Sequence, residues 1–111
     1  MPATGKVSDS GDPTFVTPQD AKKYAAIAVL NALAAVKSVI GDLDRVKKVV
    51  KVVGFVASDP EFTGQPGVIN GASELLGEIF GEAGTHARSA VGVPVLPLDS
   101  PVEVEIIVEY V

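Results

Sequence analysis

The chain has 111 residues, of which 47% are apolar and 21% are charged, and it carries a net charge of −5. It has no cysteine, which excludes disulfides, thiolate nucleophiles and thiolate metal sites. The acidic balance disfavours nucleic acid as a partner, because affinity for a phosphate backbone comes largely from lysine and arginine. A chain of this size forms one domain with a thin core, so we expect association between subunits to stabilise it.

We expect a protein of the cytoplasm that does not use a membrane. No stretch of about 18 apolar residues is expected to span a bilayer, and the polar N-terminus lacks the pattern of a signal peptide. Five lysine and arginine residues lie between Lys37 and Lys51, which we interpret as a solvated face rather than an RNA site. We expect no metal site and no cofactor.

The chain divides into an N-terminal arm or loop, residues 1–16, and one folded domain, residues 17–111. The arm is rich in glycine, proline, serine and aspartate and shows no periodicity, which is typical of a loop or a poorly ordered segment.

The domain begins with a predicted long helix. Thr17 is placed to cap it, Pro18 suits its first position, and Asp20 can return a capping bond. Gly41 predicts its end, after Ile40. Apolar residues at helical spacing form one stripe, made of Ala26, Val29, Leu30, Leu33, Val36 and Ile40.

A strand, a helix and two more strands follow. Residues 45–57 are rich in valine and predict a strand in the middle of a sheet. Residues 65–83 predict a helix that ends at Gly84, with an apolar side of Val68, Ala72, Leu75, Leu76, Ile79 and Phe80. Residues 88–93 and 102–110 are the last two predicted strands. The order indicates an α+β fold, a mixed sheet with two helices packed on one face.

The final strand sorts its residues into two faces by alternation. One face is apolar, with Val102, Val104, Ile106, Val108 and Tyr110; the other carries Glu103, Glu105, Ile107 and Glu109. The apolar face suits the two helix stripes. The acidic face must therefore meet water, a ligand or another subunit.

Arg88 lies at the start of the preceding strand and shares a face with Ala90 and Gly92. Small neighbours leave room for the planar guanidinium to bind a carboxylate bidentately. From the pattern alone, the alternative is an ion pair between Arg88 and a glutamate of the final strand.

Three other residues could take part in catalysis: His86, Ser73 and Ser89. His86 is the only histidine, and we interpret it as a solvated or capping residue at the junction between helix and strand. Ser73 and Ser89 have no neighbouring His–Asp pattern, which disfavours a serine hydrolase.

Three runs of the sequence resemble the RidA (YjgF) family, and within it the branch often labelled endoribonuclease L-PSP. They are VLNALAAVKSVIGDLDRVKKVVKVVGFV, VINGASELLGEIFGEAGTHARSAVGV and LPLDSPVEVEIIVE. The most specific part is ARSAVGV followed by PVEVEIIVE, an Ala-Arg-Ser strand and then a Glu-x-Glu strand.

The resemblance implies a chorismate-mutase-like (RidA-like) fold, a homotrimer, and a ligand cleft at each subunit junction. The implied ligand is a small carboxylate-bearing molecule, and the implied reaction is hydrolysis of reactive enamines or imines, such as 2-aminoacrylate, to keto acid and ammonia. Within this cleft the resemblance implies that Arg88 holds the substrate carboxylate and that Asn70 and Ala90 help to shape the binding site. Glu105 would be the catalytic group that positions or activates water.

Two features depart from the family pattern. The family domain begins with a β-hairpin ending in a Ser-Gly-Gln-type motif, and this chain starts after that motif, which implies an N-terminally truncated fold. Ala90 stands where many deaminases of the family carry cysteine. Three alternatives therefore stay open: an enamine or imine deaminase, a non-catalytic ligand-binding or regulatory trimer, and, with less support, an endoribonuclease.

Overall fold

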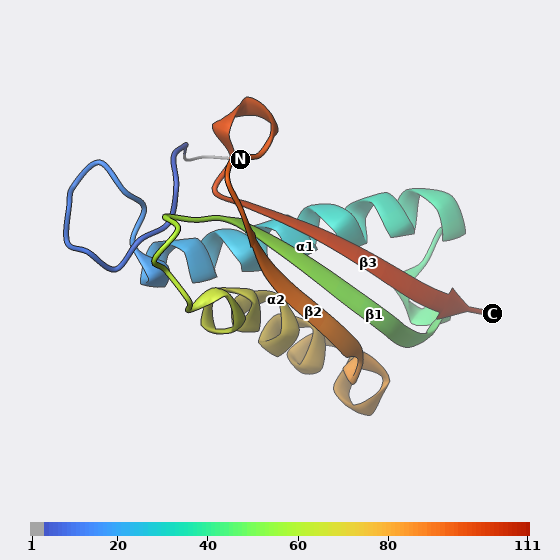
Figure 1. Cartoon of the computed structure of the whole chain (residues 1–111). Coiled ribbons are helices and arrows are strands. Elements are labelled where there is room, and N and C mark those ends of the chain that lie inside the picture. Colours follow the sequence, from blue (N-terminus) through green and yellow to red (C-terminus); the bar gives the residue numbers. More distant parts are fainter. Residues whose placement is uncertain (1–3) are drawn as a thin grey trace.

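The computed structural model describes residues 4–111, which form an α+β fold (Figure 1). The main elements are α1 (Pro18–Ile40), β1 (Val46–Ala57), α2 (Gln65–Phe80), β2 (Ala87–Val93) and β3 (Val102–Tyr110). Short 3-10 turns, η1 (Leu43–Arg45), η2 (Gly81–Gly84) and η3 (Pro97–Asp99), lie between them. The predicted order of helix, strand, helix, strand and strand is confirmed.

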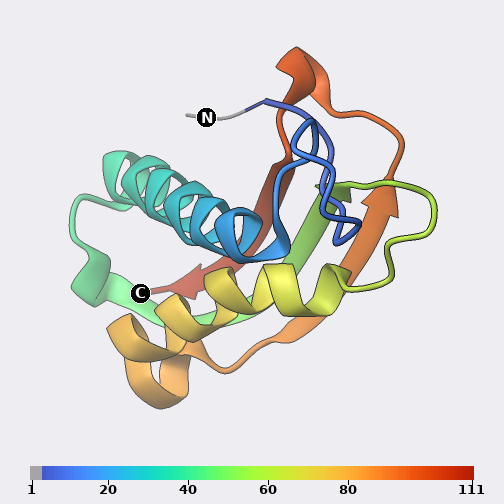
Figure 2. The same ribbon diagram turned by 90° about the vertical axis from the view of Figure 1, so that its left-hand side faces the viewer.

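The three strands form one mixed sheet in the order β2-β1-β3. The valine-rich strand β1 is central, as its sequence predicted; it runs parallel to β2 and antiparallel to β3. Figure 2 shows both helices on the same side of this sheet, where their buried residues join those of the strands in one core. The two helices and the mixed sheet therefore have the predicted arrangement.

Local signals set the ends of α1. The Thr17 hydroxyl accepts a hydrogen bond from the Asp20 N–H at 3.2 Å, and Gly41 ends the helix with a φ of 90°. The buried side chains are Ala21, Ala25, Val29, Leu33 and Ile40. Leu30, which we predicted in the buried stripe, is 50% exposed. It follows Val29 by about 100° around the helix axis and so points to one side of the buried stripe.

α1 also has the length and composition of a membrane-spanning helix, with a mean hydropathy of 1.5 over its most apolar window. This corrects the expectation that the sequence holds no such stretch. Helices that pack in a protein core meet the same criterion. In the fold, the buried face of α1 packs against α2 and β3.

The second helix is shorter than predicted. It ends at Phe80, because Gly81 adopts a φ of 61° and stops the helix there. Gly84, the predicted end, lies in the following turn η2 and is buried. A Cβ atom at Gly84 would collide with the carbonyl group of Leu76, so the turn can pack against α2 only with glycine at this position.

A close contact between Gly54 and Ile69 seats α2 on the sheet. Gly54 lies in β1, and a Cβ atom there would collide with the side chain of Ile69. Ile69 is fully buried, although the predicted apolar stripe of α2 did not include it. The absence of a side chain at Gly54 thus lets α2 approach the sheet backbone.

Residues 4–16 form a loop at one end of the sheet; residues 1–3 of the predicted arm lie outside the described part of the chain. Val7 anchors this loop. Its side chain is fully buried, its N–H donates to the Ala57 carbonyl at 2.7 Å, and its own carbonyl accepts from the Asp59 N–H at 3.0 Å.

Candidate functional site

Arg88 lies on the helix-covered face of β2. It pairs in register with Val52 of β1, which is fully buried beneath the helices. Ala90 packs against the core on the same face, and at Gly92 a Cβ atom would approach the amide nitrogen of Gln65 to 2.7 Å. The predicted common face of Arg88, Ala90 and Gly92 is therefore confirmed.

Two side chains of α2 hold the guanidinium of Arg88. Its Nη1 donates to Oδ1 of Asn70 at 2.7 Å and lies 3.3 Å from the hydroxyl oxygen of Ser73, to which it also donates. Asn70 and Ser73 are three residues apart, so they lie on the same side of the helix. The structure brings the predicted residues Arg88 and Asn70 together, and it adds Ser73, which the sequence pattern disfavours only as a hydrolase nucleophile.

The other edge of the guanidinium has no partner in the described chain. The bonds to Asn70 and Ser73 use both hydrogens of Nη1, whereas Nε and Nη2 carry three more. Within residues 4–111 these have no protein acceptor, and the single ion pair joins Lys22 to Glu74. Arg88 therefore presents a positively charged, planar edge of the kind that binds a carboxylate bidentately.

His86 extends this hydrogen-bonded cluster. Its Nε2 lies 2.9 Å from the Ser73 hydroxyl oxygen, and its Nδ1 lies 2.6 Å from the carbonyl oxygen of Gly84 in η2. The ring is half-buried. It bonds a carbonyl at the end of a helical turn, as a capping residue does, but its bond to Ser73 also links it to Arg88. We call Arg88, Asn70, Ser73 and His86 the arginine cluster.

Spacing in the sequence contained a signal for both residues that were missed. Ser73 follows Asn70 at helical spacing, and His86 precedes Arg88 by two residues, so each shares a side with a residue already selected. The contact between Ser73 and His86 has no such signal in the sequence spacing, because it depends on how α2 packs beside β2.

Glu105, the predicted catalytic residue, lies on the opposite face of the sheet from the arginine cluster. It pairs with Val53, the neighbour of buried Val52, so its side chain points away from the helices. Glu103 and Glu109 are exposed on the same face. Because the sheet separates these carboxylates from Arg88, the alternative of an ion pair between Arg88 and a β3 glutamate is wrong.

We call the side of the sheet without helices the open face. Its central strand positions carry several apolar side chains, with Val53 and Phe55 half-buried and Val91 and Ile107 exposed by 42% and 48%. Ser89 lies beside Val53, and Lys51 lies beside Ile107. The glutamates of β3 lie along one side of these positions. The open face thus combines exposed apolar side chains with Glu105.

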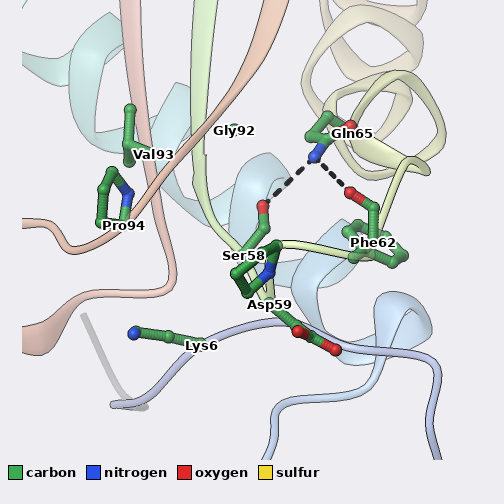
Figure 3. A pocket seen from close by; sticks show the side chains of 9 residues that line it. Lys6, Ser58, Asp59, Phe62, Gln65, Gly92, Val93 and Pro94 are labelled. Atoms are coloured by element: carbon green, nitrogen blue, oxygen red, sulfur yellow. Dashed lines mark hydrogen bonds between the residues drawn. The ribbon is translucent and has the colours of Figure 1, made fainter.

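A separate cavity lies at the other end of the junction between β2 and α2 (Figure 3). Its volume is about 390 Å³, and it is lined by Lys6, Ser58, Asp59, Pro60, Phe62, Gln65, Gly92, Val93 and Pro94. The Gln65 amide spans its wall, donating to the Phe62 carbonyl at 2.8 Å and to the Ser58 hydroxyl at 3.4 Å. Gly92 is four strand residues from Arg88, a separation of about 13 Å, so this cavity is distinct from the arginine cluster.

No metal-binding cluster of three His, Asp or Glu side chains occurs in the part of the chain that the structure describes.

The chain matches a family model described as "YjgF/chorismate mutase-like, putative endoribonuclease" over residues 12–110. It is 46% identical over 95 residues to Protein TCP17 of Trypanosoma cruzi, a match that covers 85% of this chain and 59% of that protein. The chain therefore spans about three fifths of the length of this curated relative.

Two solved structures share the fold. One is the protein Atu1372 of Agrobacterium tumefaciens, described as having unknown function, with a TM-score of 0.91 and 44% identity over 98% of this chain and 66% of that chain. The other is a "putative endoribonuclease" from Shewanella oneidensis MR-1, with a TM-score of 0.87 and 33% identity over 96% of this chain and 67% of that chain.

Proposed function

Because the chain belongs to the YjgF/chorismate-mutase-like (RidA-like) family, we propose that it binds a small carboxylate-bearing enamine or imine and hydrolyses it to keto acid and ammonia. One observation carries the proposal. The Nε and Nη2 edge of Arg88 is charged and has no acceptor within residues 4–111, while Asn70 and Ser73 fix the opposite edge.

In the proposed reaction the substrate carboxylate accepts two hydrogen bonds from the free edge of Arg88. An enamine first gains a proton on carbon and loses one from nitrogen, which gives the imine. Water then adds to the imine carbon, giving one proton to a base while the nitrogen gains one. The remaining hydroxyl proton passes to the nitrogen as the C–N bond breaks, which releases ammonia and leaves the keto acid. Orientation of the substrate and proton transfer by a positioned carboxylate are sufficient for this chemistry.

We assign the carboxylate to Glu105 of a neighbouring subunit. Within one chain the sheet stands between Glu105 and Arg88, so the two residues can share a substrate only across a subunit boundary. The exposed apolar side chains Val91 and Ile107 on the open face support this assignment, because clustered exposed apolar residues often mark a protein–protein contact. We propose a homotrimer in which each site combines Arg88 of one subunit with Glu105 of the next.

The direct test is release of ammonia from 2-iminobutyrate generated in situ. We expect Arg88→Ala to lower kcat/KM by about tenfold to a hundredfold, the usual cost of hydrogen bonds to a charged group. Lys23→Ala, which removes an exposed charge on α1, serves as the control and should leave the rate unchanged. Equal rates for the Arg88→Ala variant and the wild type would refute the assignment.

A second candidate function is ligand binding without catalysis. It is favoured by the position of the two main site residues. Within one chain, Arg88, which would bind the substrate carboxylate, and Glu105, which would be the catalytic group, lie on opposite faces of the sheet. Specific binding of 2-oxobutyrate, with no release of ammonia above the uncatalysed rate, would identify this function.

Ribonuclease activity, which the description of the Shewanella structure carries, is the least supported candidate for this chain. The net charge of −5 opposes binding of RNA, and the sequence has a single histidine, so it cannot supply a catalytic histidine pair. RNA cleavage that persists through further purification and is lost in Arg88→Ala would reverse this ranking.

A further inference from the structure

The hydrogen bonds around His86 allow only one assignment of donors and acceptors when the ring is neutral. The Gly84 carbonyl can only accept, so Nδ1 of His86 must carry a hydrogen and donate it. In the neutral ring, Nε2 is then an acceptor, and its partner at 2.9 Å, the Ser73 hydroxyl, must donate to it.

This direction determines what Ser73 can offer to Arg88. Because the single hydroxyl hydrogen of Ser73 points to His86, the oxygen keeps its lone pairs for other donors. Nη1 of Arg88 lies 3.3 Å away and donates to this oxygen. The sequence of donors is therefore Arg88 to Ser73, Ser73 to His86, and His86 to the Gly84 backbone.

The far end of this chain of bonds is fixed by the fold. Gly84 is buried in η2, where any side chain would collide with the backbone of Leu76 in α2. The fold thus fixes the position of the Gly84 carbonyl. The hydrogen bond to this carbonyl holds the ring of His86, and the ring in turn holds the Ser73 hydroxyl. With Asn70 as the second acceptor, Nη1 is held from two directions.

We propose that Ser73 and His86 are positioning residues that orient Arg88 for binding of a substrate carboxylate. This inference rests on the proposed function, because it takes the free edge of Arg88 as the carboxylate site. Neither residue touches the substrate. Their role is to hold the guanidinium so that Nε and Nη2 face outward, which lowers the entropy lost when a carboxylate binds.

The tautomer of His86 tests the proposed direction without any ligand. The chain has one histidine, so the ring nitrogen signals in a long-range ¹H–¹⁵N NMR spectrum need no assignment by mutation. In the neutral ring we expect the hydrogen on Nδ1 and none on Nε2. A hydrogen on Nε2 would contradict the inference.

Binding of 2-oxobutyrate, measured by calorimetry on the full chain, tests the effect on Arg88. We expect Ser73→Ala to raise the Kd by about threefold to tenfold, the effect of losing one hydrogen bond. Ser38→Ala is the matched control: this serine is exposed on α1, its hydroxyl bonds only the Ala35 carbonyl among the described residues, and its loss should leave the Kd unchanged.

Two substitutions of His86 separate its two bonds. An asparagine nitrogen reaches the position of Nδ1 and can keep the bond to Gly84, but it offers no acceptor to Ser73. A glutamine reaches the position of Nε2 and can accept from Ser73. We therefore expect His86→Asn to weaken binding as Ser73→Ala does and His86→Gln to restore most of it, whereas a merely structural role would not separate the two variants.

The outcomes distinguish this inference from the proposed function. If Arg88→Ala abolishes 2-oxobutyrate binding while Ser73→Ala and His86→Asn bind as the wild type does, the positioning role is wrong and the carboxylate site stands. If Arg88→Ala binds as the wild type does, the carboxylate site itself is wrong. Thermal unfolding of each variant shows that any loss of binding comes from a folded protein.

Discussion

At the scale of single residues, the arginine cluster orients a positive charge without neutralising it. Asn70 and Ser73 are neutral acceptors, and each takes a hydrogen of Nη1. A carboxylate in place of either would form an ion pair inside the chain and would compete with an anionic ligand. The amide of Asn70 therefore matters for its lack of charge as much as for its acceptor oxygen.

The substitution Asn70→Asp tests this reasoning directly. The new carboxylate would lie where Oδ1 of Asn70 now accepts from Arg88, so it would supply an internal counter-ion. We expect the Kd for 2-oxobutyrate to rise by about tenfold or more, since hydrogen bonds between two charged groups are the stronger ones. Calorimetric titration at neutral pH measures the change.

The chain offers a matched control, because Asn31 is its only other asparagine and is exposed on α1. Asn31→Asp adds the same charge away from the cluster and should change the Kd by less than about twofold at physiological salt. Binding by Asn70→Asp as tight as that of the wild type would mean that Arg88 is not the carboxylate site.

At the scale of elements, the position of α2 decides whether the arginine cluster can form. Ile69 packs directly on Gly54 of β1, and Asn70, the next residue, and Ser73, one turn further on, both contact Arg88. A side chain at position 54 would lift α2 from the sheet. The contact between a strand glycine and a helix isoleucine thus connects core packing to the geometry of the site.

The substitution Gly54→Ala should lower the free energy of unfolding by about 1–3 kcal/mol, the usual cost of overpacking a core. Urea denaturation measures this loss. In an Ile69→Ala background the added methyl group meets no isoleucine, so the cost of Gly54→Ala should shrink in a double-mutant cycle.

Gly77→Ala is the control for this cycle. Gly77 lies in α2, and a Cβ atom there would meet nothing within 4 Å. The substitution should therefore leave stability unchanged or raise it by up to about 1 kcal/mol, because alanine favours helix over glycine. An equal loss of stability for Gly54→Ala in both backgrounds would show that Ile69 is not the residue it displaces.

Local signals in the sequence predicted most element boundaries. Thr17 and Gly41 mark the ends of α1, and valine content marked β1, because caps and propensities act over a few residues. The predicted end of α2 was wrong, because two nearby glycines could each end a helix. Only the fold reveals that Gly81 takes the positive φ, while Gly84 serves close packing.

The arrangement of the candidate site was harder to predict. Alternation placed Glu105 on the acidic face of β3 correctly, because the apolar face of that strand is unambiguous. β2 has no such contrast, so the face on which Arg88 lies follows from its register with Val52. The contact between Ser73 and His86 joins two elements and has no signature in either one.

At the scale of the whole molecule, the two faces of one sheet carry the two halves of the proposed site. The helix-covered face holds Arg88 with its hydrogen-bond partners, and the open face holds Glu105 beside apolar side chains. One chain cannot bring these halves together. The proposed activity therefore depends on assembly, and burial of the open face would both stabilise the subunits and complete each site.

Complementation between two impaired variants tests this central claim most directly. Arg88→Ala keeps Glu105, and Glu105→Gln keeps Arg88, so each homo-oligomer has only defective sites. After subunit exchange in an equal mixture, about one quarter of the junctions in a symmetric ring combine an intact Arg88 with an intact Glu105. We predict that ammonia release from 2-iminobutyrate recovers to about that fraction of the wild-type rate. A mixture whose rate stays at the mean of the two separate variants, although mass spectrometry shows mixed oligomers, would contradict a site shared between subunits.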